Sequence, residues 1–136
     1  MNTGDATAVL DASALLAVVN QEAGRERVEE AVAAGALLST VNWAEVLTRL
    51  VMSGADPDAV TAVALPTGNA GQLQLIPFDD EQAREAARLI RKTRSLGLSL
   101  ADRAALALAK LRGLPVLTSD RAWRSLRLSI KIEIIR

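Results

Sequence analysis

The chain has 136 residues, half of them apolar, and a formal net charge of zero, which suits a single domain over residues 1–136. It contains no Cys and no His, which excludes disulfides and thiolate metal sites, disfavours zinc, and leaves oxygen-ligated Mg²⁺ or Mn²⁺ as candidate metals. One Phe, two Trp and no Tyr argue against recognition of nucleic acid by base stacking on aromatic residues.

Apolar runs separated by turn residues predict alternating strands and helices along the first half. A short strand over 6–10 precedes a helix that begins at Asp11 or Ser13 and runs to about Asn20. The elements that follow are a helix over 24–34, a strand over 36–39, a helix over 41–52 and a helix from 56 to about 66. The segment 67–71 contains two Gly and an Asn and predicts a turn or loop.

The second half continues the same alternation. Its predicted elements are a strand over 73–78, a long helix over 79 to about 95, a helix over 100–111 capped by Ser99, a strand over 115–118, a short helix over 120–125 and an edge strand over 130–134. Such alternation favours right-handed crossovers and a mostly parallel sheet covered by helices on both faces, an α/β fold. Ligands of these sheets bind beyond the carboxyl ends of the strands, where Asp11 and Asp120 lie.

Neither a membrane span nor a secretory signal is predicted. The longest apolar stretches, such as 12–19, fall well short of the ~20 residues that a transmembrane helix requires. The first five residues lack the positive charge that opens a secretory signal. We therefore expect a soluble cytoplasmic protein without a membrane partner.

The charges are unevenly distributed along the chain. Residues 1–79 hold three Arg against ten Asp and Glu, a formal charge of −7, whereas residues 80–136 hold thirteen Lys and Arg against six Asp and Glu, a formal charge of +7. A basic half can follow phosphates, but solvated helix faces explain the same asymmetry. Two sets of arginines stand out in this half: Arg84, Arg88 and Arg91, which share a predicted helix face, and Arg121, Arg124 and Arg127.

Four acidic residues lie at strand-to-helix turns or within predicted helices, and each has a structural explanation when taken alone. Asp11 and Asp120 follow strands and suit helix N-caps. Asp102 falls among apolar residues of its helix, where an unpaired carboxylate costs several kcal/mol, so a salt bridge or a first-turn dipole role would explain it. Glu45 points away from the apolar stripe of its helix and could pair with Arg49 four residues later.

Taken together, the segments around these acids resemble the PIN-domain ribonucleases, and most closely the toxin component of VapBC-type toxin–antitoxin modules. The resemblance spans nearly the whole chain. It rests on four segments in the family's order, which are 9–15, 39–46, 97–103 and 114–123. No acidic position of the family pattern is missing.

This resemblance implies a three-layer α/β/α sandwich with a mostly parallel central sheet of four to five strands. It also implies that the four acids converge on one cleft and catalyse Mg²⁺- or Mn²⁺-dependent hydrolysis of RNA phosphodiester bonds. Asp11 and Asp102 would be the leading metal ligands, with Glu45 and Asp120 completing the cluster directly or through water. Ser13 and Thr118 would orient the carboxylates or the scissile phosphate. An antitoxin partner and a homodimer are further expectations.

Two alternatives remain open on the sequence. The first is an acid-pocket phosphotransfer or phosphatase domain with Asp11 as nucleophile, although the Asp11-Ala12-Ser13 segment offers no second acid. The second is a catalytically inactive PIN-like module that only binds protein.

Overall fold

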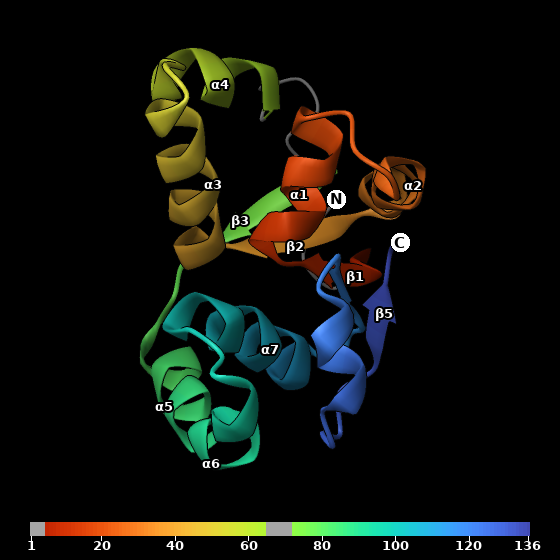
Figure 1. Ribbon diagram of the computed structural model, residues 1–136, viewed down its shortest axis with the longest axis vertical. Coiled ribbons are helices and arrows are strands. Elements are labelled where there is room, and N and C mark those ends of the chain that lie inside the picture. Colours follow the sequence, from red (N-terminus) through yellow and green to blue (C-terminus); the bar gives the residue numbers. More distant parts are fainter. Residues whose placement is uncertain (1–4, 65–71) are drawn as a thin grey trace.

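A sheet of five short parallel strands organises the part of the chain that the computed structural model describes, residues 5–64 and 72–136 (Figure 1). The strands lie in the order β3-β2-β1-β4-β5, and every neighbouring pair is parallel. Their bounds are β1 Ala8–Leu10, β2 Ala36–Ser39, β3 Leu73–Ile76, β4 Val116–Thr118 and β5 Ile132–Ile134. The predicted edge strand near the C-terminus is confirmed as β5.

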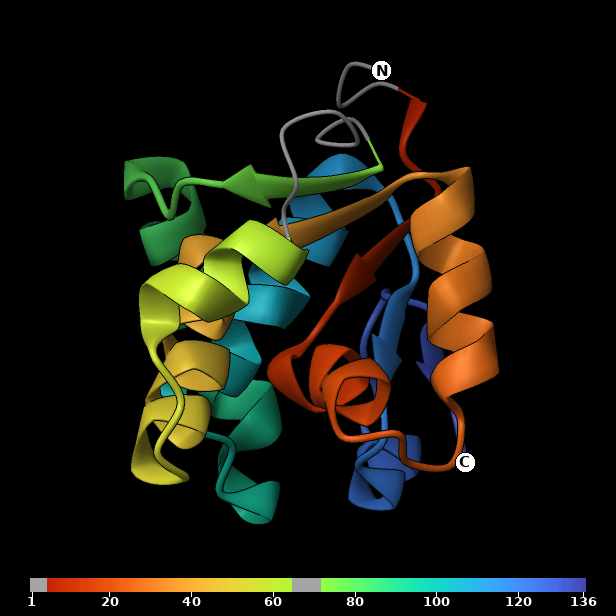
Figure 2. The same cartoon turned by 90° about the horizontal axis from the view of Figure 1, so that it is seen from above.

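Helices cover both faces of this sheet. Helices α1, α2 and α4 lie on one side and α5, α6 and α7 on the other, while α3 contacts both α1 and α7 (Figures 1 and 2). The helices are α1 Ala12–Val19, α2 Arg25–Ala34, α3 Thr40–Met52, α4 Pro57–Ala64, α5 Asp80–Arg88, α6 Ile90–Thr93 and α7 Leu100–Arg112, with 3₁₀ turns η3 Arg94–Leu96 and η4 Arg121–Ser125. The predicted three-layer α/β/α sandwich is therefore confirmed.

The central strands are apolar throughout because both of their faces are buried. In β1, Leu10 joins the core formed with α1, α2 and α3, whereas Val9 joins the core formed with α5 and α7. The same alternation places Leu38 and Leu37 of β2 in the two cores. A parallel sheet covered by helices requires such continuous apolar runs.

The strand order reverses at β1, which lies between β2 and β4. From β1 the chain proceeds outward to β2 and β3, and it then crosses to the opposite side of β1 to form β4 and β5. The carboxyl ends of β1 and β4 consequently diverge into different connections, which opens a crevice at this switch point. Asp11 follows β1 and Ser119 follows β4, so both flank that crevice.

Three sequence expectations need correction or qualification. The helix expected over 79–95 is not continuous: α5 ends at Arg88 and α6 begins at Ile90. The Leu89 carbonyl accepts the Lys92 amide as well as the Thr93 amide, both over 3.1 Å, so the chain tightens toward a 3₁₀ turn there. The short helix after Asp120 is a 3₁₀ turn rather than an α-helix. The loop expected over 67–71 lies outside the described residues.

Across residues 5–64 and 72–136, no helix has the length and apolar character needed to cross a membrane. The expected cytoplasmic location stays a prediction.

Candidate functional site

The structure brings the four predicted acids to one pocket at the carboxyl ends of β1 and β4. The pocket has a volume of about 340 Å³, and Ser13, Ser99 and Arg49 contribute to its wall. The acids come from four places in the chain: the end of β1, the middle of α3, the first turn of α7 and the turn after β4. They are Asp11, Glu45, Asp102 and Asp120.

Asp11 is the most buried of these acids, with 4% of its surface exposed. It caps α1, since its Oδ1 accepts the Ala14 amide at 2.9 Å and the Ser13 hydroxyl at 2.7 Å. Its Oδ2 accepts the Thr118 hydroxyl at 2.5 Å. Burial raises the pKa of Asp11 to about 6 against the lowering effect of these hydrogen bonds, and the charge of Asp102 raises it further.

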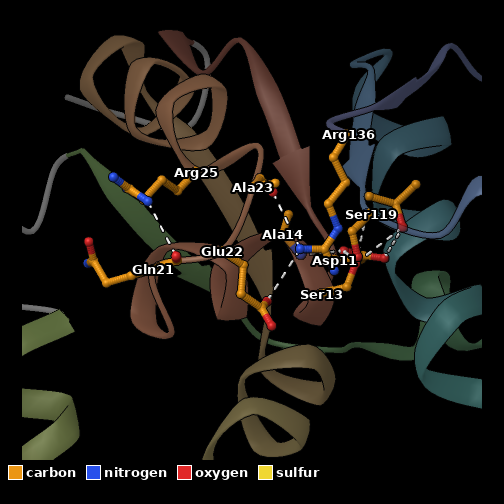
Figure 3. A network of polar contacts seen from close by, with 10 residues as sticks. Asp11, Ser13, Ala14, Gln21, Glu22, Ala23, Arg25, Ser119 and Arg136 are labelled. Carbon is orange, nitrogen blue, oxygen red and sulfur yellow. Dashed lines mark hydrogen bonds and ion pairs between the residues drawn. The ribbon is translucent and has the colours of Figure 1, made fainter.

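The two hydroxyls that contact Asp11 also hold the turn after β4. Figure 3 shows Ser13 and Ser119 gathered around Asp11, and the Ser119 amide donates to the Ser13 hydroxyl over 2.9 Å. The Asp120 amide donates to the Thr118 hydroxyl over 3.1 Å. Each hydroxyl therefore donates to the buried carboxylate and accepts from the backbone that leads to Asp120. These contacts place the two predicted auxiliary residues, Ser13 and Thr118, directly on Asp11.

Asp102 is half-buried and belongs to a capping box at the start of α7. Its Oδ2 accepts the Ser99 amide at 3.0 Å, and the Ser99 hydroxyl accepts the Asp102 amide at 3.1 Å. The first-turn explanation given by the sequence is thus realised, whereas the salt-bridge alternative is not realised within 4.0 Å among the described residues. The carboxylate still lines the pocket, and its charge raises the pKa of both Asp11 and Glu45.

Glu45 is half-buried, and the face of α3 that carries it borders the pocket rather than open solvent. Burial raises its pKa and the charge of Asp102 adds to the effect, while Arg49 and the Asn42 amide oppose it. The predicted surface ion pair with Arg49 is not formed within 4.0 Å among the described residues, although both side chains line the pocket.

Asp120 is the most exposed acid of the four. It caps η4 as predicted, because its Oδ1 accepts the Ala122 amide at 3.0 Å. The carboxylate also borders the pocket, so the cap and the pocket wall are formed by the same side chain.

Two further residues of α3, Asn42 and Arg49, belong to this region but were not predicted as site residues. Asn42 is 1% exposed and donates from Nδ2 to the carbonyl of Ala101 over 2.9 Å, which ties α3 to the first turn of α7. Its Oδ1 has no hydrogen-bond partner among the described residues. Arg49 lines the pocket, although the sequence suggested only an ion pair. The spacing of Asn42, Glu45 and Arg49, at i, i+3 and i+7, places all three on one helix face and could have revealed them.

The donors in this pocket are carboxylate and hydroxyl oxygens, the chemistry that Mg²⁺ and Mn²⁺ prefer. As the side chains lie, no three acidic groups within residues 5–64 and 72–136 are close enough together to hold a metal ion.

A parallel sheet with acids at its switch point is the arrangement expected from the resemblance, and comparison with known proteins confirms the class. Residues 8–127 match the PIN domain family, so the chain belongs to that family. It is also 30% identical, over 138 residues, to Ribonuclease VapC5 of Mycobacterium tuberculosis, in a match that covers 100% of this chain and 99% of that relative.

Solved structures share the fold. VapBC-5 of Mycobacterium tuberculosis, a member of the VapBC family of toxin–antitoxin systems, is 26% identical with a TM-score of 0.56, and the match covers 96% of this chain and 98% of that one. VapBC2 of Rickettsia felis, solved with a DNA fragment from its promoter, is 13% identical with a TM-score of 0.70 over 94% of this chain and 98% of that one. At that identity the second likeness concerns the fold alone.

Proposed function

We propose that this chain is a metal-dependent endoribonuclease, the toxin of a toxin–antitoxin pair, and that residues 1–136 act as one domain. The proposal is supported by the relation to Ribonuclease VapC5. The observation that carries it is the convergence of Asp11, Glu45, Asp102 and Asp120, from four separate segments, on one pocket.

The electrostatics of the pocket favour a bound cation. Asp11 is buried, its pKa is raised to about 6, and the charge of Asp102 contributes to that rise. These carboxylates are costly together, and a divalent cation would offset the cost. Asp11 and Asp102 would be the main ligands, with Glu45 and Asp120 acting directly or through water. When bound, Mg²⁺ or Mn²⁺ would activate a water molecule and offset the charge of the scissile phosphate.

The residues of the chain would position the reaction. Ser13 and Thr118 hold both oxygens of Asp11, so this carboxylate has a fixed direction in the pocket. With no histidine in the chain, a carboxylate is the side chain available to accept a proton from the attacking water. Water would form the new P–O bond as the P–O3′ bond breaks, which leaves a 5′-phosphate and a 3′-hydroxyl.

Purified protein tests the proposal directly. Wild-type protein should cleave single-stranded RNA in Mn²⁺ or Mg²⁺ and lose activity in EDTA, and Asp102→Asn should abolish cleavage. Asp79→Asn is a matched control, because Asp79 caps α5 through the Gln82 amide at 2.9 Å but does not line the pocket. Undiminished turnover by the Asp102→Asn protein would refute the assignment.

An antitoxin that blocks the pocket is the partner proposed for this chain, since the structural relatives include toxin–antitoxin complexes. Self-association as a homodimer is proposed with it. Phosphotransfer domains of the alternative kind usually also need a lysine from late in the chain, and no lysine is among the described residues that line this pocket. Absence of Mn²⁺ binding by calorimetry would favour the alternative of an inactive protein-binding module.

A further inference from the structure

A second pocket adjoins the acidic one, and two arginines against a single acid line it. Its volume is about 570 Å³, and it shares Ser13, Leu16 and Arg49 with the acidic pocket. Arg136 lines it as well, together with one acid, Glu22, and the neutral polar side chains of Asn20, Thr48 and Ser53. The two pockets therefore form one continuous groove that is acidic at one end and carries two arginines beyond it.

Both guanidinium groups are available to a ligand. Arg49 makes no ion pair within 4.0 Å among the described residues. Arg136 is held loosely, with Nη1 at 3.6 Å from Oε1 of Glu22 and at 3.4 Å from the carbonyl of Ala23 (Figure 3). Both distances exceed those of well-formed charged hydrogen bonds, so an anion could replace these contacts.

We propose that this second pocket binds backbone phosphate of the RNA strand next to the cleavage position, through Arg49 and Arg136. The proposal rests on the proposed ribonuclease function and adds a substrate-positioning subsite to it. The acidic pocket repels a phosphodiester, whereas guanidinium groups in the adjoining pocket attract one. By holding the neighbouring phosphate, the two arginines would determine which phosphate of the strand lies over the acids.

The two sets of arginines singled out in the basic half of the sequence are less suited to this task. Within the first set, Arg84 pairs with Asp80 at 3.1 Å and Arg88 pairs with Glu85 at 3.0 Å. In the second set, Arg121 donates from Nε to the carbonyl of Arg136 over 3.1 Å. None of the residues in either set lines the acidic pocket or its neighbour within the described part of the chain.

RNA binding measures the subsite without relying on cleavage. A fluorescein-labelled, mixed-sequence single-stranded RNA oligonucleotide is titrated by anisotropy with Asp102→Asn protein at fixed Mg²⁺ and several KCl concentrations. Adding Arg49→Gln or Arg136→Gln should weaken binding about tenfold, the loss of one charged hydrogen bond. Each change should also reduce the slope of log Kd against log salt by about 0.7, the value for one phosphate of a single strand. A second RNA sequence should give the same losses, because a phosphate contact is indifferent to base identity.

Arg112→Gln in the same background is the matched control. Arg112 is exposed and lies roughly 15 Å further along α7 than Asp102, at 1.5 Å per residue. Its substitution therefore removes the same charge at a distance from the groove. Its effect on the slope should be much smaller than that of either groove variant.

A gain of binding provides an independent test. Glu22→Gln releases Arg136 and should strengthen RNA binding, and this gain should disappear in Arg136→Gln protein. Glu30→Gln is the control, since it removes the same charge from another ion pair of 3.6 Å, with Arg27.

The possible failures are distinguishable. If the Asp102→Asn protein binds RNA but Arg49→Gln and Arg136→Gln behave like Arg112→Gln, the subsite is refuted while the ribonuclease proposal stands. Losses that depend on the RNA sequence would also refute phosphate recognition. Failure of wild-type protein to cleave or bind RNA would overturn the subsite together with the proposed function.

Discussion

Replacing Asp11 by Asn should make the protein more stable at neutral pH and less stable in acid. The change removes a buried charge and replaces the carboxylate by an amide of nearly the same shape. The carbonyl oxygen of Asn can still accept the Ala14 amide and the Ser13 hydroxyl, as Oδ1 of Asp11 does. Only the acceptor for the Thr118 hydroxyl is lost.

The magnitude follows from the raised pKa. Between a pKa of 3.8 in the unfolded chain and about 6 in the folded protein, the folded state binds more protons, so wild-type stability falls as pH rises through this window. A shift of about two pKa units corresponds to about 3 kcal/mol of destabilisation of the folded wild-type protein. This destabilisation is complete above the folded pKa and absent below the unfolded pKa. The Asn variant also lacks the hydrogen bond that Thr118 makes to the uncharged carboxyl group, about 1 kcal/mol; the extra strength of this bond toward the ionised carboxylate is already contained in the folded pKa. The variant should therefore gain about 2 kcal/mol at neutral pH and lose about 1 kcal/mol near pH 3.

Urea unfolding followed by tryptophan fluorescence measures this difference. Trp43 and Trp123 are both buried and pack in the two different cores, so they report on the whole fold. The experiment uses EDTA, which removes adventitious cations that would mask the cost of the charge. Asp79→Asn is the control, because it makes the same Asp-to-Asn change at a capping residue that is exposed.

The refuting result is a difference between wild-type and Asp11→Asn protein that stays constant, or changes in the opposite direction, from pH 3 to pH 8. Such a result would mean that burial does not destabilise the ionised carboxylate. The electrostatic argument for a cation in the pocket would then lose its basis.

Three further outcomes follow from the same contacts. Mg²⁺ at ten times its Kd should stabilise wild-type protein by about 1.4 kcal/mol and Asp11→Asn protein by much less, as thermal unfolding would reveal. Thr118→Val should destabilise the protein by about 2 kcal/mol at neutral pH, and urea titrations should find a smaller loss in acid, where the carboxyl group is protonated. Ser99→Ala should cost about 1 kcal/mol and Ser99→Gly only a few tenths in the same titrations, and equal losses would contradict the cap.

Most of the fold follows from local features of the sequence. Strand β2 has the predicted bounds 36–39 because an apolar run lies between Gly35 and the cap Ser39. Helix α7 was located by its cap Ser99 and its terminal Gly113, which adopts the left-handed conformation. The four acids could be singled out because three of them follow strands or begin helices, where the backbone itself favours a carboxylate.

The remaining features depend on packing that no local pattern contains. The position of Glu45 away from the apolar stripe of α3 suggested that its side chain faces solvent. Because α3 packs against both α1 and α7, the helix face that carries Glu45 borders a pocket instead. Arg136 lies at the end of the chain and reaches the groove only because β5 runs parallel to β4.

Capping and function are not competing explanations for these acids. Asp102 and Asp120 each use one oxygen to accept a backbone amide at the start of a helical segment, which fixes the side chain beside the pocket. The second oxygen of each accepts no hydrogen bond among the described residues and can serve a ligand. Parallel strands bring such helix starts together at one edge of the sheet, so capping carboxylates accumulate there. The fold thereby assembles a group of acids whose mutual repulsion a divalent cation would relieve.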